Sequence, residues 1–370
     1  MRESIDGASF AQAMIHAAAS LNLQKQQINE LNVFPVPDGD TGTNMSLTLG
    51  TAAAELRKKQ PHTVGEAAAT NASALLRGAR GNSGVILSLL FRGFAKAVKD
   101  KDSIDGRDLA IALDFGVAAA YKAVMKPAEG TILTVSRLTA ARAADAARQT
   151  PNDPEAVLEA AIAEGQLALE HTTEMNPVLK KAGVVDAGGK GFLVILQGML
   201  DSLRGVPMPE GDSEGEAKVE SKTDYAAIAA EEITFTFDTV FIVRKTSPHK
   251  GLEAFEAYLN SIGDSLVIGE DDDCFKVHVH TDIPGAALTG SGRRPPHPEH
   301  RRSGRGGGRA GGESRGTEDR PAGEEVRRGG RGGGRRPGRG VPRLGGRRRH
   351  QRRPDHEPLH RRHPAGDRRY

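Results

Sequence analysis

The sequence has little cysteine and no long apolar run, and each shortage excludes a class of protein. Its single cysteine, Cys274, cannot form a disulfide within the chain, which excludes a disulfide-stapled domain and favours a reducing compartment. No run approaches the roughly 18 apolar residues of a membrane-spanning helix. The N-terminus also lacks the charged and then apolar pattern of a signal peptide. These absences predict a cytoplasmic protein with no membrane span.

The charge is divided between two parts of opposite sign. Residues 291–370 contain 24 Arg, no Lys and 9 acidic residues, a net charge of +15, whereas residues 1–290 have a net charge of −12. The basic part also lacks Ile, Phe and Met, so it has too little apolar surface to form a core. We therefore expect an acidic globular protein followed by a disordered Arg/Gly-rich tail over residues 290–370.

Apolar spacing predicts that residues 1–204 form a helical domain. Residues 10–31 place apolar side chains on one helix face, and Pro35 ends that helix. Alanine-rich helical sequence then runs to about residue 76. No segment before residue 204 alternates with the period of a strand, so we predict an all-α first domain. Its further helices are expected at about 85–98, 107–125, 132–148, 154–171 and 192–203.

A second domain is predicted after a linker. Residues 205–223 have the composition of a linker, rich in Gly, Pro, Ser and Glu. The period then changes to two in "ITFTFDTVFIV", and "GLEAFEAYLNSIG" is a short amphipathic helix. "SLVIG" and "CFKVHVH" form two more strands around an acidic turn. Residues 224–289 are therefore expected to form a small α+β domain with the order β-α-β-β.

The loop "NVFPVPDGDTGTN", residues 32–44, carries two carboxylates one residue apart. Asp and Gly are common turn residues, so Asp38 and Asp40 could belong simply to a turn. Carboxylate oxygens are also the protein ligands that Mg²⁺ shares with phosphate oxygens and water. Two carboxylates this close repel each other unless a cation neutralises them. The loop is therefore a candidate Mg²⁺ site.

Two glycine-rich segments stand before predicted helices. "GARGNSG" (78–84) and "DAGGKG" (186–191) expose backbone N–H groups at a helix N-terminus, which is a phosphate cradle. Each signal is weak alone, because glycine also ends and joins helices. The sequence contains no GxxxxGK[ST] motif, which excludes a P-loop protein. Together with the acidic loop, the segments indicate a helical Mg²⁺-phosphate site without a P-loop.

Four stretches of the sequence resemble one known family. They are "LNVFPVPDGDTGTNMSLT", "LLRGARGNSGVILSLLFRGFAK", "KPAEGTILTV" and "NPVLKKAGVVDAGGKGFLVILQGML". The resemblance is to the ATP-binding subunit of bacterial fatty acid kinase, and it covers about residues 5–289. The first domain of that subunit is similar to the DhaL-like nucleotide-binding subunit of dihydroxyacetone kinase. The resemblance implies an eight-helix barrel that binds ATP and Mg²⁺ at one mouth.

The resemblance also implies roles for particular residues. Asp38 and Asp40 would be the metal carboxylates at the catalytic centre, with Asn32 in the place of a third metal ligand. The nucleotide-binding residues would lie around the phosphates and, for the last two, near the nucleoside: Thr41, Thr43, Asn44, Gly81, Asn82, Ser83, Thr131, Asp186 and Gly188.

The implied reaction is phosphoryl transfer from ATP to the carboxylate of a fatty acid, which gives an acyl phosphate. A carboxylate with a pKa of roughly 4–5 is already ionised at neutral pH, so no general base is needed. Charge neutralisation by the metals would do most of the work. In the family a separate carrier protein presents the fatty acid, and the kinase dimerises through its middle domain. A dihydroxyacetone kinase is the alternative enzyme.

A possible second metal site lies in the predicted α+β domain. His278 and His280 are two apart on a strand, so they point to the same face and could reach one metal ion. Two surface histidines on a half-exposed strand would give the same pattern. In relatives a cysteine in the first strand completes a zinc site with these histidines. Asp238 occupies the matching position here, and Cys274 lies elsewhere, so the expected Zn²⁺ ligands are Asp238, His278 and His280.

The tail has two interpretations. A disordered Arg/Gly segment binds RNA electrostatically, which makes an RNA-binding protein the non-enzymatic alternative. The same composition is what GC-rich DNA gives when it is read out of frame. Residues 353–364, back-translated and read one base further on, resemble a motif of the third domain of the family. We therefore favour a frameshift at about residues 289–292. The carrier-docking third domain would then be missing, and any binding of nucleic acid by the tail would be incidental.

Overall fold

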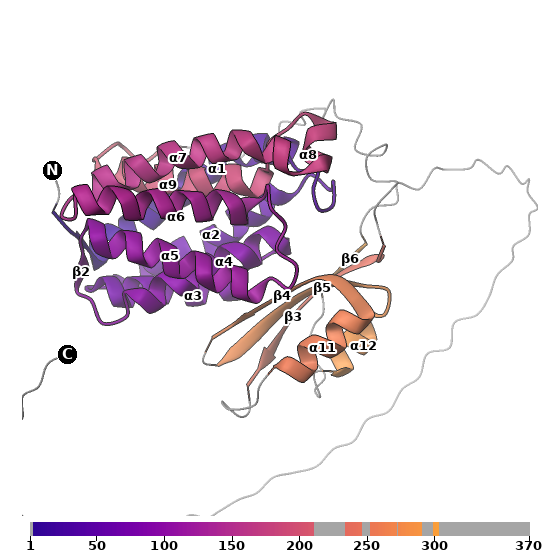
Figure 1. Ribbon diagram of the computed structural model, residues 1–370. Coiled ribbons are helices and arrows are strands. Elements are labelled where there is room, and N and C mark those ends of the chain that lie inside the picture. The colour runs from indigo at the N-terminus through magenta and orange to yellow at the C-terminus, as the bar shows by residue number, and fades with distance from the viewer. Residues whose placement is uncertain (1–2, 211–233, 246–251, 272, 291–298, 303–370) are drawn as a thin grey trace, which may run out of the picture. The chain divides into compact units, whose positions relative to one another are not determined.

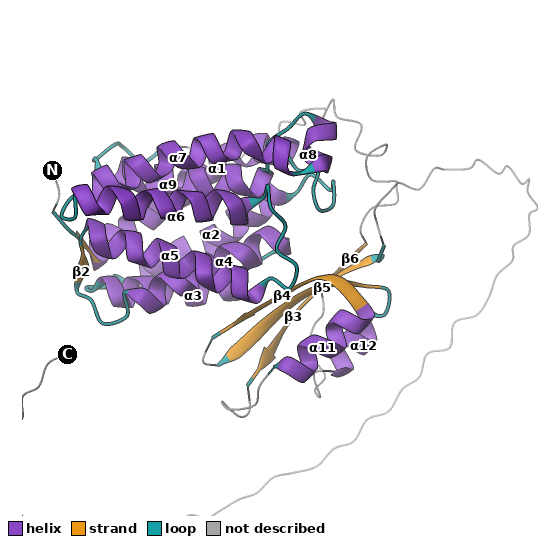
Figure 2. Cartoon of the chain, viewed as in Figure 1, coloured by secondary structure: helices purple, strands orange, loops and turns teal. Residues whose placement is uncertain are grey.

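The computed structural model describes residues 3–210, 234–245, 252–271, 273–290 and 299–302 (Figure 1). Most of the predicted linker, and all of the predicted tail except residues 299–302, lie outside these ranges. The described residues form a helical part and a part built around an antiparallel sheet, which Figure 2 separates by colour. The prediction of an out-of-frame or RNA-binding tail concerns residues outside the described ranges.

The helical part begins with a short pairing and continues with long helices. Strand β1 (Ile5–Asp6) pairs antiparallel with β2 (Ser103–Ile104), a contact that the all-α prediction did not include. Each strand has only two residues, which is too short to show a period in the sequence. The helices are α1 (Gly7–Glu30), α2 (Thr41–Lys59), α3 (Val64–Gly78), α4 (Gly81–Ala97), α5 (Gly106–Ala123), α6 (Ile132–Gln149), α7 (Pro154–Met175), α8 (Pro177–Ala182) and α9 (Ala187–Leu203).

Local capping sets where several of these helices start. Asp6 accepts a hydrogen bond from the Ser9 amide at 2.8 Å and begins α1. Thr63 and Glu66 form a reciprocal capping box that begins α3. Each such cap pairs backbone N–H groups that the first turn of a helix leaves without partners. The alanine-rich segment that was predicted as continuous helix is therefore divided into α2 and α3.

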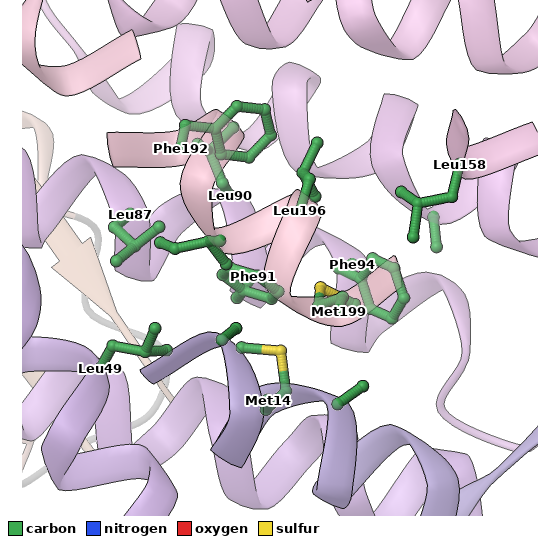
Figure 3. Close-up of a cluster of buried hydrophobic side chains, with 14 of the residues drawn as sticks. Met14, Leu49, Leu87, Leu90, Phe91, Phe94, Leu158, Phe192, Leu196 and Met199 are labelled. Carbon is green, nitrogen blue, oxygen red and sulfur yellow. The ribbon is translucent and has the colours of Figure 1, made fainter. Parts of the chain in front are cut away.

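The core of the helical part is made by apolar side chains from helices distant in sequence. Phe10 of α1 stacks on Phe94 of α4 with ring centroids 5.4 Å apart. In α9, residues 192–196 are all buried, and Figure 3 shows Phe192, Leu196 and Met199 of this helix among side chains of α1, α2, α4 and α7. An added Cβ at Gly198 would lie 2.7 Å from the Ala17 Cα, so glycine is needed where α9 meets α1. This packing fixes the helix ends, where the candidate site lies.

The second part is a four-stranded antiparallel sheet. Its strand order is β4 (Gly263–Glu270), β5 (Cys274–Thr281), β3 (Phe237–Arg244) and β6 (Glu299–Arg302). Helices α11 (Glu253–Ile262) and α12 (Pro284–Gly290) lie on one face of the sheet (Figure 1). Residues Phe275, Val277 and Val279 of β5 belong to the core beneath them. Because side chains alternate along a strand, Lys276, His278 and His280 point to the opposite face.

Two features of this part differ from the prediction. Helix α12 was not foreseen, and residues 299–302 pair as β6 with β3 although they were expected to belong to a disordered tail. The backbone of β3 offers an open edge to which a neighbouring segment can add a strand, whatever its side chains. The predicted β-α-β-β order is otherwise present, as β3, α11, β4 and β5.

Candidate functional site

One cavity of about 760 Å³ collects most of the residues that the sequence singled out. The first residues of α2, α4, α6 and α9 all line it, and so do parts of β3, β4 and β5. The N-terminus of each helix carries unpaired backbone N–H groups and the positive end of the helix dipole. Four such ends at one cavity favour an anionic ligand, and phosphate groups are the anions that this geometry binds best.

The loop between α1 and α2 is held at both ends by asparagine side chains. Asn32 is buried, its Nδ2 donates to the Val36 carbonyl at 2.7 Å, and its Oδ1 accepts from the Thr41 amide at 2.9 Å and from the Thr41 hydroxyl. Asn29 bonds to the backbone amide and the hydroxyl of Thr43, both at 3.0 Å. In this geometry Asn32 braces the loop and both lone pairs of its Oδ1 are used. Its role as a metal ligand stays a prediction.

Asp38 and Asp40 both face the cavity from this loop. Desolvation by the surrounding protein and the neighbouring Asp40 carboxylate raise the pKa of Asp38 to about 7. Asp40 also accepts a hydrogen bond from Asn44 Nδ2 at 2.7 Å, which orients its carboxylate. Two acidic groups that disfavour each other's charge form a site that a divalent cation would stabilise. The donor set therefore fits Mg²⁺.

The start of α4 forms the second wall of the cavity. Gly81 has φ +57°, and an added Cβ there would lie 2.5 Å from Asn44 Nδ2, so only glycine suits this position. The buried Thr48 hydroxyl accepts from the Arg80 amide at 3.1 Å and holds the turn. Asn82 Oδ1 is buried and has no hydrogen-bond partner among the described residues. An unpaired oxygen beside Asp38 and Asp40 suits a cation or the hydrated ligand of one.

The starts of α6 and α9 form the far end of the cavity. The Thr131 hydroxyl donates to the Ala128 carbonyl at 2.8 Å and caps the Leu133 amide at 3.3 Å, so it is committed to starting α6. Asp186 is buried and its Oδ2 accepts from the Gly189 amide at 2.6 Å, which starts α9. Burial raises the pKa of Asp186 to about 6. A buried carboxylate retained at the cavity wall is a candidate for binding a hydrogen-bond donor of the ligand.

The raised pKa of Asp186 predicts an unusual stability change. The ionised carboxylate costs the folded state more than the unfolded state, so its contribution to stability falls as the pH rises from about 4 through about 6. We expect Asp186→Asn, which keeps an oxygen for the Gly189 amide, to raise the free energy of unfolding by ~1–3 kcal/mol near pH 8. Urea denaturation at about pH 4 and pH 8 would measure this, and the gain should vanish at the lower pH.

A matched control for this prediction is Asp153→Asn. Asp153 also caps a helix, since its Oδ1 accepts from the Ala156 amide at 3.0 Å, but it stands half-buried at the start of α7 away from the cavity. We expect no gain in stability from this change. If Asp186→Asn were less stable than the wild type at both pH values, the carboxylate would be a net stabilising group and the prediction would be wrong.

The sheet presents a group of potential metal ligands to the same cavity. One ligand atom each of Asp238, His278 and His280 lies within 4.8 Å of the others. The Nε2 atoms of His278 and His280 are 3.2 Å apart, and His278 Nδ1 is 3.2 Å from Asp238 Oδ1. Strand register explains this grouping, because Asp238 of β3 and Asp264 of β4 both lie opposite His280 of β5. His280 Nδ1 is 3.6 Å from Asp264 Oδ1.

These histidines are not surface residues. His278 is 1% exposed and His280 is 9% exposed, which contradicts the alternative of two histidines on a half-exposed strand. Burial, and then the charge of Lys276, lowers the pKa of His278 to about 3. Burial, and then His278, lowers the pKa of His280 to about 4. Both imidazoles are therefore neutral at neutral pH, which is the form that binds zinc. Cys274 is buried on the same strand but does not belong to this group.

The cavity brings together most of the predicted site residues and adds others. Thr43 does not line it, because its amide and hydroxyl both face Asn29. Lys126 and Asp264 do line it and were not predicted. Lys126 opens the quoted stretch "KPAEGTILTV", so its position in a shared motif was a usable signal. Asp264 follows the predicted sheet helix, and only strand register places it beside His280.

Comparison with known proteins agrees with this division of the chain. Residues 35–201 match the family described as the DAK2 domain, and residues 234–293 match the family described as the FakA-like middle domain of fatty acid kinase. The chain belongs to the family of DAK2-domain proteins with a FakA-like middle domain. The acidic loop, the GARGNSG turn and Asp186 thus lie in the DAK2 domain, and the Asp238–His278–His280 group lies in the middle domain.

Curated relatives of this DAK2-domain chain include bacterial proteins of about twice the matched length. Protein YloV of Bacillus subtilis (strain 168) is 41% identical over 293 residues, which is 77% of this chain and 53% of that protein. An uncharacterized protein of Staphylococcus haemolyticus is 41% identical over 290 residues, which is 77% of this chain and 52% of that protein. The chain spans about half the length of the curated relatives that it matches.

A solved structure of a dihydroxyacetone kinase is also similar to part of the DAK2-domain chain. The native form of the C. freundii enzyme has a TM-score of 0.41 and 21% sequence identity, and the match covers 52% of this chain and 34% of that one. None of the helices in the described ranges has the combined length and apolar character that crossing a bilayer requires.

Proposed function

We propose that this chain is a Mg²⁺-dependent phosphotransferase that transfers a phosphoryl group from ATP to a fatty acid carboxylate. Membership of the DAK2 family supports a kinase, and the middle domain supports the acyl substrate. The observation that carries the proposal is the cavity itself, where four helix N-termini meet the carboxylates of Asp38 and Asp40. This arrangement has backbone donors for phosphate groups and oxygen ligands for their cation.

In this proposal each wall of the cavity has a task. Asp38 and Asp40 hold Mg²⁺, which neutralises the charge of the phosphate groups when it is bound. The N–H groups at Gly81, Asn82 and Ser83 bind phosphate oxygens at the start of α4. The walls near Ile132, Asp186 and Gly188 surround the nucleoside. The acceptor is already an anion at neutral pH, so no residue has to remove a proton from it.

The histidine group supports a second metal. Asp238, His278 and His280 supply one carboxylate and two neutral imidazoles within reach of one another, a donor set that suits zinc. Asp264 lies next to His280 Nδ1 and is placed to orient that ring, as carboxylates beside metal-bound histidines commonly are. We therefore propose Zn²⁺ as a resident ion of the middle domain.

The finer features of the proposal follow from the family resemblance. The helices of residues 1–204 would form an eight-helix barrel, residues 224–289 would form the middle domain, and a homodimer would assemble through that domain. The fatty acid would be presented by a separate carrier protein in the cytoplasm.

A comparison of phosphate acceptors tests the proposed reaction. We expect the full chain with Mg²⁺-ATP to phosphorylate carboxylate acceptors, namely octanoate at high concentration and fatty acid bound to a carrier protein. Trapping with hydroxylamine would detect the acyl phosphate as a hydroxamate. Dihydroxyacetone, which has no carboxylate, should give no product above the acceptor-free control. Phosphorylation of dihydroxyacetone without any hydroxamate would instead establish the alternative enzyme.

A further inference from the structure

The cavity has an uneven balance of charge. Five carboxylic acids line it, and among its described lining residues Lys126 is the only Lys or Arg. The acids are Asp38, Asp40, Asp186, Asp238 and Asp264. A nucleoside triphosphate is strongly anionic, and an acidic cavity repels it unless cations intervene. Bound metal can supply part of this positive charge at the acidic loop, and Lys126 is the cation that the protein itself supplies.

Lys126 has no competing partner in the described structure. Its side chain is exposed, and no hydrogen bond or ion pair joins it to any described residue. A lysine beside so many carboxylates would ordinarily form an ion pair with one of them. The carboxylates nearest in role are engaged elsewhere, because Asp40 is bonded to Asn44 and Asp186 is bonded to Gly189. The Lys126 ammonium is therefore available to an anionic ligand.

A hydrogen-bond network fixes the loop that carries Lys126. The Glu129 carboxylate accepts from the Thr134 hydroxyl at 2.6 Å, from Arg137 at 2.8 Å and from the Tyr121 hydroxyl at 3.1 Å. The Thr134 hydroxyl in turn accepts from the Gly130 amide at 2.8 Å. These bonds join the end of α5 to the start of α6 across the loop. The backbone of Lys126 is thus held at the cavity edge before any ligand arrives.

We propose that Lys126 binds the phosphate chain of the nucleotide and makes the site selective for its more highly phosphorylated form. The inference rests on the proposed function, because it takes ATP as the ligand. The ammonium is a flexible donor that forms charge-assisted hydrogen bonds with phosphate oxygens. Its contribution should therefore grow with the number of phosphate groups and be absent for a nucleoside.

The test is a comparison of ligands on the full chain with Mg²⁺ present. We expect Lys126→Met to weaken ATP binding by about 10- to 100-fold, to weaken ADP binding less, and to leave adenosine binding unchanged. Lys126→Arg should retain most of the ATP affinity, because it keeps the charge. Lys122→Met is the matched control: Lys122 is exposed one helical turn earlier and does not line the cavity, so ATP affinity should be unchanged.

A second variant separates binding by the ammonium from support by the loop. Thr134→Val removes the hydroxyl that links Gly130 to Glu129, and it should weaken ATP and adenosine by the same factor. If Lys126→Met also weakened both ligands equally, Lys126 would only support the loop and the proposal would be overturned. Unchanged ATP affinity in Lys126→Met would overturn it as well. Failure of the wild-type chain to bind Mg²⁺-ATP would count against the proposed function instead.

Discussion

Replacing Asp38 or Asp40 by asparagine is expected to weaken Mg²⁺-dependent ATP binding by about 100-fold or more, equivalent to ~3 kcal/mol for a lost charged ligand. The change keeps the size of each side chain but removes the charge that holds the cation. Asp38 lies in a loop and is exposed to the cavity, so the fold should be unaffected. Isothermal calorimetry at about pH 8, where Asp38 is ionised, measures the affinity, and thermal unfolding checks the fold.

Asp100→Asn is the control for this pair. It removes one exposed carboxylate from the turn after α4, outside the cavity, and should leave ATP affinity unchanged. The effect of the loop variants should also depend on the metal, so that omitting Mg²⁺ brings the wild type close to the variants. Wild-type affinity in both loop variants would refute the assignment of Asp38 and Asp40 as cation ligands.

Loss of a histidine from the middle domain is expected to have an effect of similar size on zinc. His278→Ala removes one ligand of the proposed site and should reduce zinc affinity on the order of 100-fold. Zinc content after dialysis, measured by atomic emission, should fall from about one ion per chain to none. Because His278 is buried, Asp238→Asn serves as a milder variant that tests the same site with less disturbance of packing.

The control variant for the zinc measurement is His62→Ala. His62 is exposed between α2 and α3 and takes no part in the cavity, so its loss should leave the zinc content unchanged. Retention of zinc by both His278→Ala and Asp238→Asn would mean that the ion binds elsewhere, and the proposed ligand set would be wrong.

Most of the helices could be predicted because a buried helix face repeats in the sequence. The segment from residue 41 to 78 was misjudged because alanine fits a helix and a helix end equally well, so its apolar pattern has little contrast. The break was nevertheless encoded. Gln60 takes a left-handed conformation at φ +46°, and the sequence from Thr63 to Glu66 has the spacing of a capping box. Attention to caps would have separated α2 from α3.

The candidate site was predictable where a motif is continuous and not where segments meet only in the fold. The acidic loop and the GARGNSG turn each state their chemistry in a few adjacent residues. The assignment of Thr43 to the phosphates could not be judged in this way, because helix position alone does not show that Asn29 takes both of its polar groups. The pairing of Asp264 with His280 depends on strand register, which no single segment contains.

The two asparagine braces across the acidic loop also determine when its conformational entropy is lost. Asn29 holds Thr43 and Asn32 holds Thr41, so the chain between them is closed at both ends before any cation binds. Fixing each backbone residue costs roughly 1–2 kcal/mol, and here that cost belongs to folding rather than to binding. A ligand that fits the closed loop is bound without an ordering penalty, whereas one that requires a wider loop must break the braces. The same hydrogen bonds that give the loop its shape therefore make it discriminate between ions by size.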